Sequence, residues 1–246
     1  MTIRERLCLA ALLLLPAAAG ATPSGQIWIP STDVQKYGTV HMNIDNYVPA
    51  SREPGGAWKA PVFDMGPTAG VLDKGGLLAE AGFDVVRSGA PADSTPLYLN
   101  AKLAAPAGAC FRGSPAVAAG VYGLGTVGSV TGQDATYAIA AMPLPRLGRV
   151  SAGYYVGNAG VLKDGSGRAS NSGLLLSLDR AFPVISDKLW AAIDYQGGRS
   201  ALGALSLGAS WAFTGKTSLL LGYNCYNDHG AAGRNTFTVQ VDIDLW

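Results

Sequence analysis

The chain has 246 residues, of which only 14% are charged, and its 18 basic and 17 acidic residues nearly balance. Soluble domains carry about 25% charged residues, so this composition is poor in charge. The near-neutral balance excludes a broad electrostatic attraction to nucleic acid. Hydrophobic residues make up 48% of the chain, so the fold must keep many apolar side chains out of water.

The first 21 residues have the layout of a secretory signal peptide. Arg4 and Arg6 give a basic start, residues 7–15 form a short apolar run, and small residues lead up to Ala21. These features mark a segment that is removed on export. The run is too short for a membrane helix, which needs about 20 apolar residues. We therefore expect cleavage near Ala21, followed by a periplasmic N-terminal segment over residues 22–38.

From residue 39 onward, apolar and polar residues alternate with a period of two in many short segments. In the last of them, Phe237, Val239 and Val241 share one face with the apolar residues that follow, while Thr238 and Gln240 share the other. A strand puts alternate side chains on opposite faces, whereas a helix would scatter them. The segments with clear alternation are residues 40–45, 79–85, 97–103, 189–196, 205–213, 219–225 and 237–245, and the weaker ones are residues 62–72, 117–127, 135–142, 149–156 and 174–179. We expect Pro67 to shorten or bulge its strand.

These segments predict an all-β fold, namely a closed antiparallel transmembrane β-barrel of about 12 strands over residues 39–246, with 10 or 14 strands as alternatives. Such barrels alternate long loops at one rim with short turns at the other. The links after odd-numbered segments are mostly long, as at residues 157–173. Those after even-numbered segments are mostly short, as at residues 214–217, with residues 104–115 as an exception.

The polar faces of the predicted strands carry many carboxylates. Burying them in a dry interior would cost several kcal/mol each unless they were paired, as approximate transfer data indicate, whereas a hydrated lumen avoids that cost. A soluble lipocalin-like barrel is the alternative, but it has about eight strands and its surface needs more charge. We therefore expect these residues to line the lumen: His41, Asn43, Asp45, Glu80, Asp84, Lys102, Asp179, Asp194, Gln240, Asp242 and Asp244.

Aromatic residues occur near the ends of several predicted strands. Amphipathic aromatics favour the two membrane interfaces, although core packing of a soluble sandwich would also bury them. We expect Tyr195, Tyr223 and Phe237 at the external interface, and Trp211 and Phe213 at the periplasmic interface.

The signal peptide, the amphipathic segments and the aromatic C-terminal Trp246 resemble those of bacterial outer-membrane β-barrel proteins of porin-like type. Residues 26–33, QIWIPSTD, are similar to the mature start of outer-membrane proteins whose function is unassigned. The resemblance implies a Gram-negative outer membrane, contact with its lipid, and insertion by the barrel-assembly machinery. It does not identify a protein partner.

Two contacts between strands can be anticipated from this arrangement. The first and last strands must meet to close the barrel, which brings His41 near Gln240 and Asp242. A hairpin around residues 87–96 in equal register places Glu80 opposite Lys102 and Asp84 opposite Tyr98.

Three functions remain open. A barrel of about 12 strands is wider than the eight-stranded size that side chains fill, so a narrow porin-like channel for small solutes comes first. Its lumen acids outnumber Lys102, which predicts a weak cation preference. A structural or surface-interaction barrel without an open pore comes second, with loops 49–61 and 157–173 binding a partner or folding inward.

An outer-membrane enzyme is the least favoured function. The histidines are His41 and His229, and neither stands in the local arrangement that outer-membrane phospholipase uses with serine. After the signal peptide, Cys110 and Cys225 have no metal-ligand spacing. We therefore expect no enzymatic activity, no metal and no other cofactor.

Overall fold

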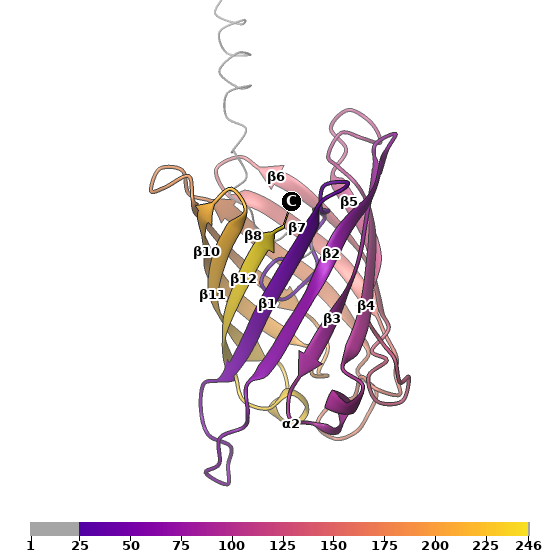
Figure 1. Cartoon of the computed structure of the whole chain (residues 1–246), viewed down its shortest axis with the longest axis vertical. Coiled ribbons are helices and arrows are strands. Elements are labelled where there is room, and N and C mark those ends of the chain that lie inside the picture. Colours follow the sequence, from indigo (N-terminus) through magenta and orange to yellow (C-terminus); the bar gives the residue numbers. More distant parts are fainter. Residues whose placement is uncertain (1–24, 246) are drawn as a thin grey trace, which may run out of the picture.

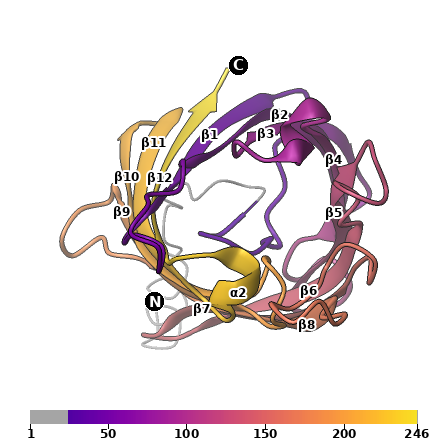
Figure 2. The same cartoon turned by 90° about the horizontal axis from the view of Figure 1, so that it is seen from below.

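The computed structural model describes residues 25–245, so the predicted signal peptide and Trp246 lie outside the described residues. Twelve antiparallel strands form a closed barrel (Figures 1 and 2). Each strand pairs with its neighbours in the sequence, and β1 pairs with β12 to close the ring. The predicted all-β barrel of 12 strands is confirmed.

The strands follow one another in sequence order, with little helix in their connections. They are β1 (Val40–Pro49), β2 (Val62–Lys74), β3 (Leu77–Arg87), β4 (Leu97–Ala105), β5 (Ala116–Gly125), β6 (Ala135–Leu144), β7 (Gly148–Val156), β8 (Ser172–Ala181), β9 (Leu189–Gln196), β10 (Ala204–Thr214), β11 (Thr217–Tyr226) and β12 (Thr236–Asp244). Among the described residues, the 3-10 turn η1 (Pro91–Ser94) precedes β4 and the helical turn α2 (His229–Ala232) precedes β12. Within residues 25–245, no helix is long and apolar enough to cross a membrane.

The connections divide between the two rims of the barrel. The links after odd-numbered strands are mostly long and gather at one end, the lower end in Figure 1, which we call the loop rim. The links after even-numbered strands gather at the other end, which we call the turn rim. Two of these links, residues 75–76 and 215–216, are tight turns, while residues 106–115 form the longer exception that the sequence indicated.

Side chains alternate between the lumen and the outer face along each strand. On β8, Leu174, Leu176 and Leu178 point outward and are between 38% and 52% exposed, while the alternate residues Leu175, Ser177 and Asp179 are buried. This arrangement inverts that of a soluble protein, in which apolar residues fill the interior. The barrel therefore presents an apolar outer wall around a polar lumen, as in membrane barrels.

The prediction that Pro67 shortens its strand is wrong, although the pairing of β2 with β3 skips Gly66 and Pro67. β2 is 13 residues long, and Pro67 lies opposite Met42 of β1 within a continuous register. The irregularity in β2 lies between Gly70 and Leu72, where its pairing with β3 shifts. Proline removes one backbone donor from the ladder, and here the neighbouring pairs on both sides maintain the strand.

The N-terminal segment, expected in the periplasm, lies inside the barrel from residue 25 onward (Figure 2). We call residues 25–39 the inserted segment. Its apolar side chains Ile27 and Ile29 are buried, and its backbone groups bond to lumen side chains. The lumen thus offers this segment both apolar contacts and hydrogen-bond partners, which explains its position.

Replacing an outward residue tests the assignment of the two faces. Leu221 lies in the middle of β11 and is 57% exposed. In lipid vesicles, Leu221→Arg should lower the free energy of unfolding by about 2–4 kcal/mol, because the arginine would face hydrocarbon.

The matched control is Leu147→Arg, in the turn between β6 and β7, where the side chain is 60% exposed. It should cost about 0–1 kcal/mol, because it lies beyond the apolar wall. Urea titration in vesicles measures both values. Equal costs for the two variants would contradict the assignment.

Candidate functional site

The tip of the inserted segment is a tight turn. The Gln26 N–H donates to the Ile29 carbonyl at 2.8 Å, and Gly25 and Pro30 form a bridge behind the turn. Trp28 reaches toward the loop rim, where its indole N–H donates to the Leu202 carbonyl at 2.8 Å. The same ring makes edge contacts with the rings of Tyr47 and Tyr226. The tip is therefore fixed by β1, β11 and the loop after β9.

Asp194 of β9 and Gln240 of β12 bind the backbone of the turn. Asp194 accepts the N–H groups of Ile27 and Trp28 at 2.8 and 2.9 Å. The Gln240 amide donates to the Ile27 carbonyl at 2.8 Å. Irregular backbone at membrane depth is tolerated where protein groups satisfy its hydrogen bonds. These two predicted lumen residues supply such partners.

Arg149 of β7 links the inserted segment to the barrel wall. Its Nη1 donates to both carboxylate oxygens of Asp33 at 2.7 Å, and its Nε donates to Asp179 at 3.0 Å. Asp179 also accepts from the Gln26 amide at 3.1 Å. Arg149 was not among the residues predicted to face the lumen, although it shares the parity of the inward residues Ser151 and Tyr155.

Glu80 and Lys102 form an ion pair on the adjoining wall. Their register in the β3–β4 ladder is as expected, and Lys102 Nζ lies 3.0 Å from Glu80 Oε1. Each residue also binds the inserted segment: Glu80 accepts the Gln35 N–H, and Lys102 donates to the Asp33 carbonyl, both at 2.7 Å. The anticipated register of these strands is confirmed, and the pair serves to position the segment.

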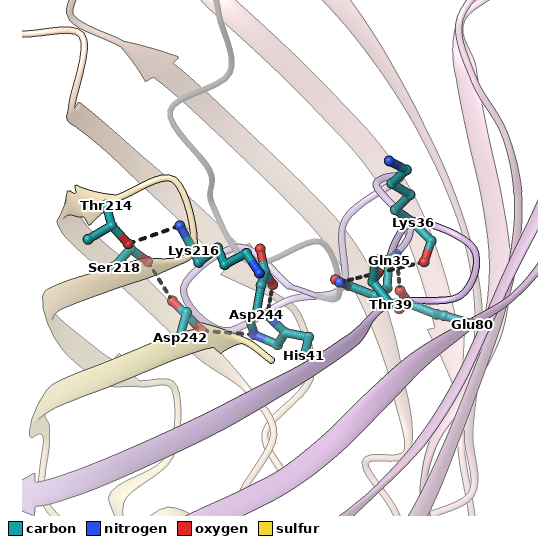
Figure 3. Close-up of polar contacts among 10 residues, drawn as sticks. All are labelled: Gln35, Lys36, Thr39, His41, Glu80, Thr214, Lys216, Ser218, Asp242 and Asp244. Carbon is teal, nitrogen blue, oxygen red and sulfur yellow. Dashed lines mark hydrogen bonds and ion pairs between the residues drawn. The ribbon is translucent and has the colours of Figure 1, made fainter. Parts of the chain in front are cut away.

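His41 joins the first strand to the last near the turn rim (Figure 3). Its Nδ1 lies 2.8 Å from Asp244, and its Nε2 lies 3.3 Å from Asp242. The Ser218 hydroxyl donates to the second oxygen of Asp242 at 3.0 Å. The expected approach of His41 to Asp242 is confirmed. The cluster connects β1, β11 and β12 across the seam that closes the barrel.

The lumen wall around β6–β8 carries an apolar cluster against which the inserted segment packs. Ile29 of the inserted segment packs into a buried cluster with Ile139, Tyr155, Leu175 and Leu162. Leu162 belongs to the long link between β7 and β8, so this loop folds inward at that point. The inserted segment and this loop together close one side of the lumen.

The opposite side contains a cavity of about 530 Å³ between the inserted segment and the wall from β12 through β1 to β5. Eight of the residues predicted to face the lumen line it: His41, Asn43, Asp45, Glu80, Asp84, Lys102, Gln240 and Asp242. Of the other three, Asp179 and Asp194 contact the inserted segment, and Asp244 lies at the turn rim beside His41.

Several polar residues of the cavity were missed in the sequence. Asp64 lies in β2, whose alternation is weak because Gly66 interrupts the polar face and Pro67 follows it on the other face. Tyr47 and Tyr122 also line the cavity, although a tyrosine suits either face of a membrane strand, while Tyr98 lies opposite Asp84 as anticipated. Asn100 was visible as a polar residue in the fourth predicted strand, with the same parity as Lys102.

Hydrogen bonds and an ion pair of Asp228 connect three links at the loop rim. This carboxylate accepts the N–H groups of Gly230 and Gly165 and pairs with Arg199 at 3.1 Å. The hydrogen bonds from the two glycines, followed by the charge of Arg199, lower the pKa of Asp228. The links after β7, β9 and β11 are thereby joined into one surface.

The aromatic residues expected at the interfaces all lie on outward positions near strand ends. Trp211 and Phe213 lie toward the end of β10, and Tyr195 toward the end of β9. Tyr223 and Phe237 lie opposite each other on β11 and β12, with ring centroids 5.0 Å apart. Their contact with lipid interfaces stays a prediction.

The site offers no recognisable place for a metal. Within the part of the chain that the structure describes, no group of three or more histidine, cysteine or acidic side chains could hold a metal ion. The cysteines of that part, Cys110 and Cys225, are free thiols.

Removing Arg149 tests how the inserted segment is held. In Arg149→Met, Asp33 and Asp179 lose their shared cation, and hydrogen bonds to charged groups contribute roughly 1.5–3 kcal/mol. Amide hydrogen exchange in residues 26–35 should accelerate at least tenfold, as measured by mass spectrometry of the detergent-solubilised barrel.

The control is Arg168→Met, which removes an exposed ion pair with Asp164 in the link between β7 and β8. It should leave exchange in residues 26–35 unchanged. Unaltered exchange in Arg149→Met would show that the segment does not depend on this contact.

No protein-family model and no curated protein matches the sequence. Among solved structures, the barrel is similar to KdgM porin, with a TM-score of 0.50 and 9% identity over 82% of this chain and 98% of that chain. It is also similar to an outer membrane channel from Pseudomonas putida F1 (TM-score 0.47, 15% identity, 94% and 99% covered) and to NanC porin (0.49, 8%, 82% and 98%). The chain therefore has the barrel fold of porins.

Proposed function

We propose that the chain is a porin-like channel that passes small solutes across the outer membrane of a Gram-negative bacterium. The observation that supports this most is the polar lumen, with a cavity of about 530 Å³, enclosed by an apolar outer wall. An apolar wall of this kind suits lipid, and a polar lumen suits water and hydrophilic solutes. The shared fold with KdgM porin supports the same reading.

The outer wall and the predicted signal peptide support the proposed location. Exposed apolar side chains occur on all sides of the barrel, for example Phe83 on β3, Val150 on β7 and Leu207 on β10. We propose that outer-membrane lipid covers this wall and that the barrel-assembly machinery inserts the exported chain.

The charges of the lumen support a weak preference for cations. Lys102 and Arg149 are each bound to carboxylates, so their charges are compensated locally. Asp45, Asp64 and Asp84 line the cavity as further acids. Fixed charges beside a narrow path set its ion selectivity, and the surplus here is negative.

We propose transport and no catalysis. Of the groups suited to acid–base chemistry, His41 is held between two carboxylates, and the nearby Ser218 hydroxyl donates to Asp242. This arrangement supports closure of the barrel, whereas serine catalysis needs the hydroxyl to bond to the base.

A structural or surface-interaction barrel without an open path is the second candidate. The inserted segment and Leu162 fill the side of the lumen around β6–β8, which favours a closed interior. The joined links around Asp228 would then form the surface that contacts a partner.

Planar-bilayer recordings separate the two candidates. The purified barrel should conduct, and reversal potentials in a KCl gradient should show a K⁺ preference of a few-fold over Cl⁻, because the uncompensated lumen charges are acidic. Asp45→Asn/Asp84→Asn should reduce that preference. Asp187→Asn, an exposed residue in the turn after β8, should not change it.

Two outcomes would count against the channel. Clear anion selectivity would contradict the acidic lumen. Absent conductance, in protein whose heat-modifiable migration shows a folded barrel, would favour the closed barrel. A protein recovered in the soluble periplasm and not in outer-membrane fractions would contradict both candidates.

A further inference from the structure

We propose that the cavity beside the inserted segment binds an organic cation with a primary ammonium group and an apolar or aromatic body. This inference rests on the proposed channel function, for which it names a solute class. It stands on three features of the cavity: the carboxylates without a counter-charge, their unpartnered oxygen atoms, and the surrounding aromatic rings.

Three carboxylates of adjacent strands face the cavity together. Asp45 of β1 and Asp64 of β2 are directly opposite in the ladder, and Asp84 lies on the neighbouring β3. Opposite residues of an antiparallel pair have Cβ atoms about 4.5–5.5 Å apart. Two like charges at this position therefore repel unless a proton or a cation neutralises one of them.

The basic groups of the lumen are already bound elsewhere. Lys102 pairs with Glu80, Arg149 bridges Asp33 and Asp179, and His41 lies between Asp242 and Asp244. Within residues 25–245, no ion pair reaches Asp45, Asp64 or Asp84. No basic side chain of the described residues therefore compensates these three carboxylates.

Two carboxylate oxygens of this wall also lack a hydrogen-bond partner. Oδ1 of Asp45 and Oδ1 of Asp64 are closed off from solvent, and neither bonds to a donor in the described residues. Asp84, by contrast, accepts from the Asn100 amide. Buried acceptors without donors are unfavourable, and an ammonium group that enters between these side chains brings three N–H donors with its charge.

Aromatic rings surround the same space. Trp28 of the inserted segment meets Tyr47 and Tyr226 edge to face, with centroids 5.2 and 5.7 Å apart, and all three rings line the cavity. Tyr98 lies opposite Asp84 in the β3–β4 ladder. Aromatic faces attract cations and pack against apolar bodies. Cavities for small organic ligands have volumes of about 300–1,000 Å³, and this one fits that range.

A metal ion fits this site less well than an organic cation. Although these three carboxylates face the same cavity, no group of three acidic, histidine or cysteine side chains within the described residues is arranged to hold a metal ion. The aromatic lining contributes no metal ligands, whereas it suits the body of an amine. The site is therefore assigned to organic ammonium compounds.

Calorimetric titration of the detergent-solubilised barrel tests the inference without requiring conductance. The probes are 2-phenylethylammonium chloride and its neutral analogue 2-phenylethanol. The wild-type barrel should bind the amine at least tenfold more tightly than the alcohol. Asp45→Asn/Asp64→Asn should weaken amine binding at least tenfold and leave alcohol binding unchanged.

The control variant is Asp187→Asn, which also removes one acidic charge but lies in an exposed turn outside the cavity. It should bind both probes as the wild type does. Heat-modifiable migration verifies that each variant is folded. If the double variant does not fold, Asp64→Asn alone should still weaken amine binding several-fold, because it removes one of the two unpartnered acceptors.

Equal affinity for amine and alcohol, or undiminished amine binding in a folded Asp45 or Asp64 variant, would overturn the inference. Failure of the channel function has a different signature. A barrel that binds the amine but does not conduct in bilayers would retain the cation site and refute transport. A barrel that conducts K⁺ but does not distinguish amine from alcohol would retain transport and refute the site.

Discussion

The closed sheet with an apolar outer wall is the constraint on which the rest of the structure depends. Closure pairs β1 with β12 and leaves each strand one inner and one outer face. Because the outer face is apolar, the charged residues of the strands must find partners within the lumen. The pairs Glu80–Lys102 and Arg149–Asp179, and the contacts of His41, meet this requirement.

The inserted segment uses the same polar wall from the inside. Asp194, Gln240, Glu80 and Lys102 each form hydrogen bonds with its backbone, and Arg149 binds its Asp33 side chain. The segment in turn divides the lumen into an apolar side that it fills and an acidic side that stays open as a cavity. The same set of wall residues thus determines both the occupied and the open half of the interior.

The period-two alternation predicted the barrel, its strand number and the parity of its lumen residues, because strand geometry is local and repeats along the chain. The Glu80–Lys102 register was also predictable, since a hairpin relates residues that are close in sequence. The inserted segment was not predictable, because its partners are remote: Ile27 bonds to Gln240 across 213 residues. Asp64 was missed because Gly66 and Pro67 obscure the alternation of β2.

Spin labels on two adjacent residues of β1 test the central claim, which is that the apolar face meets lipid and the polar face meets the lumen. Asn43 lines the cavity and Ile44 points outward. Labels at Asn43→Cys and Ile44→Cys, with Cys110 and Cys225 replaced by serine, are compared in liposomes. The account predicts that oxygen relaxes the label at position 44 preferentially and that a water-soluble nickel complex relaxes the label at position 43. Preferential relaxation of both labels by the nickel complex, or the reverse assignment, would contradict it.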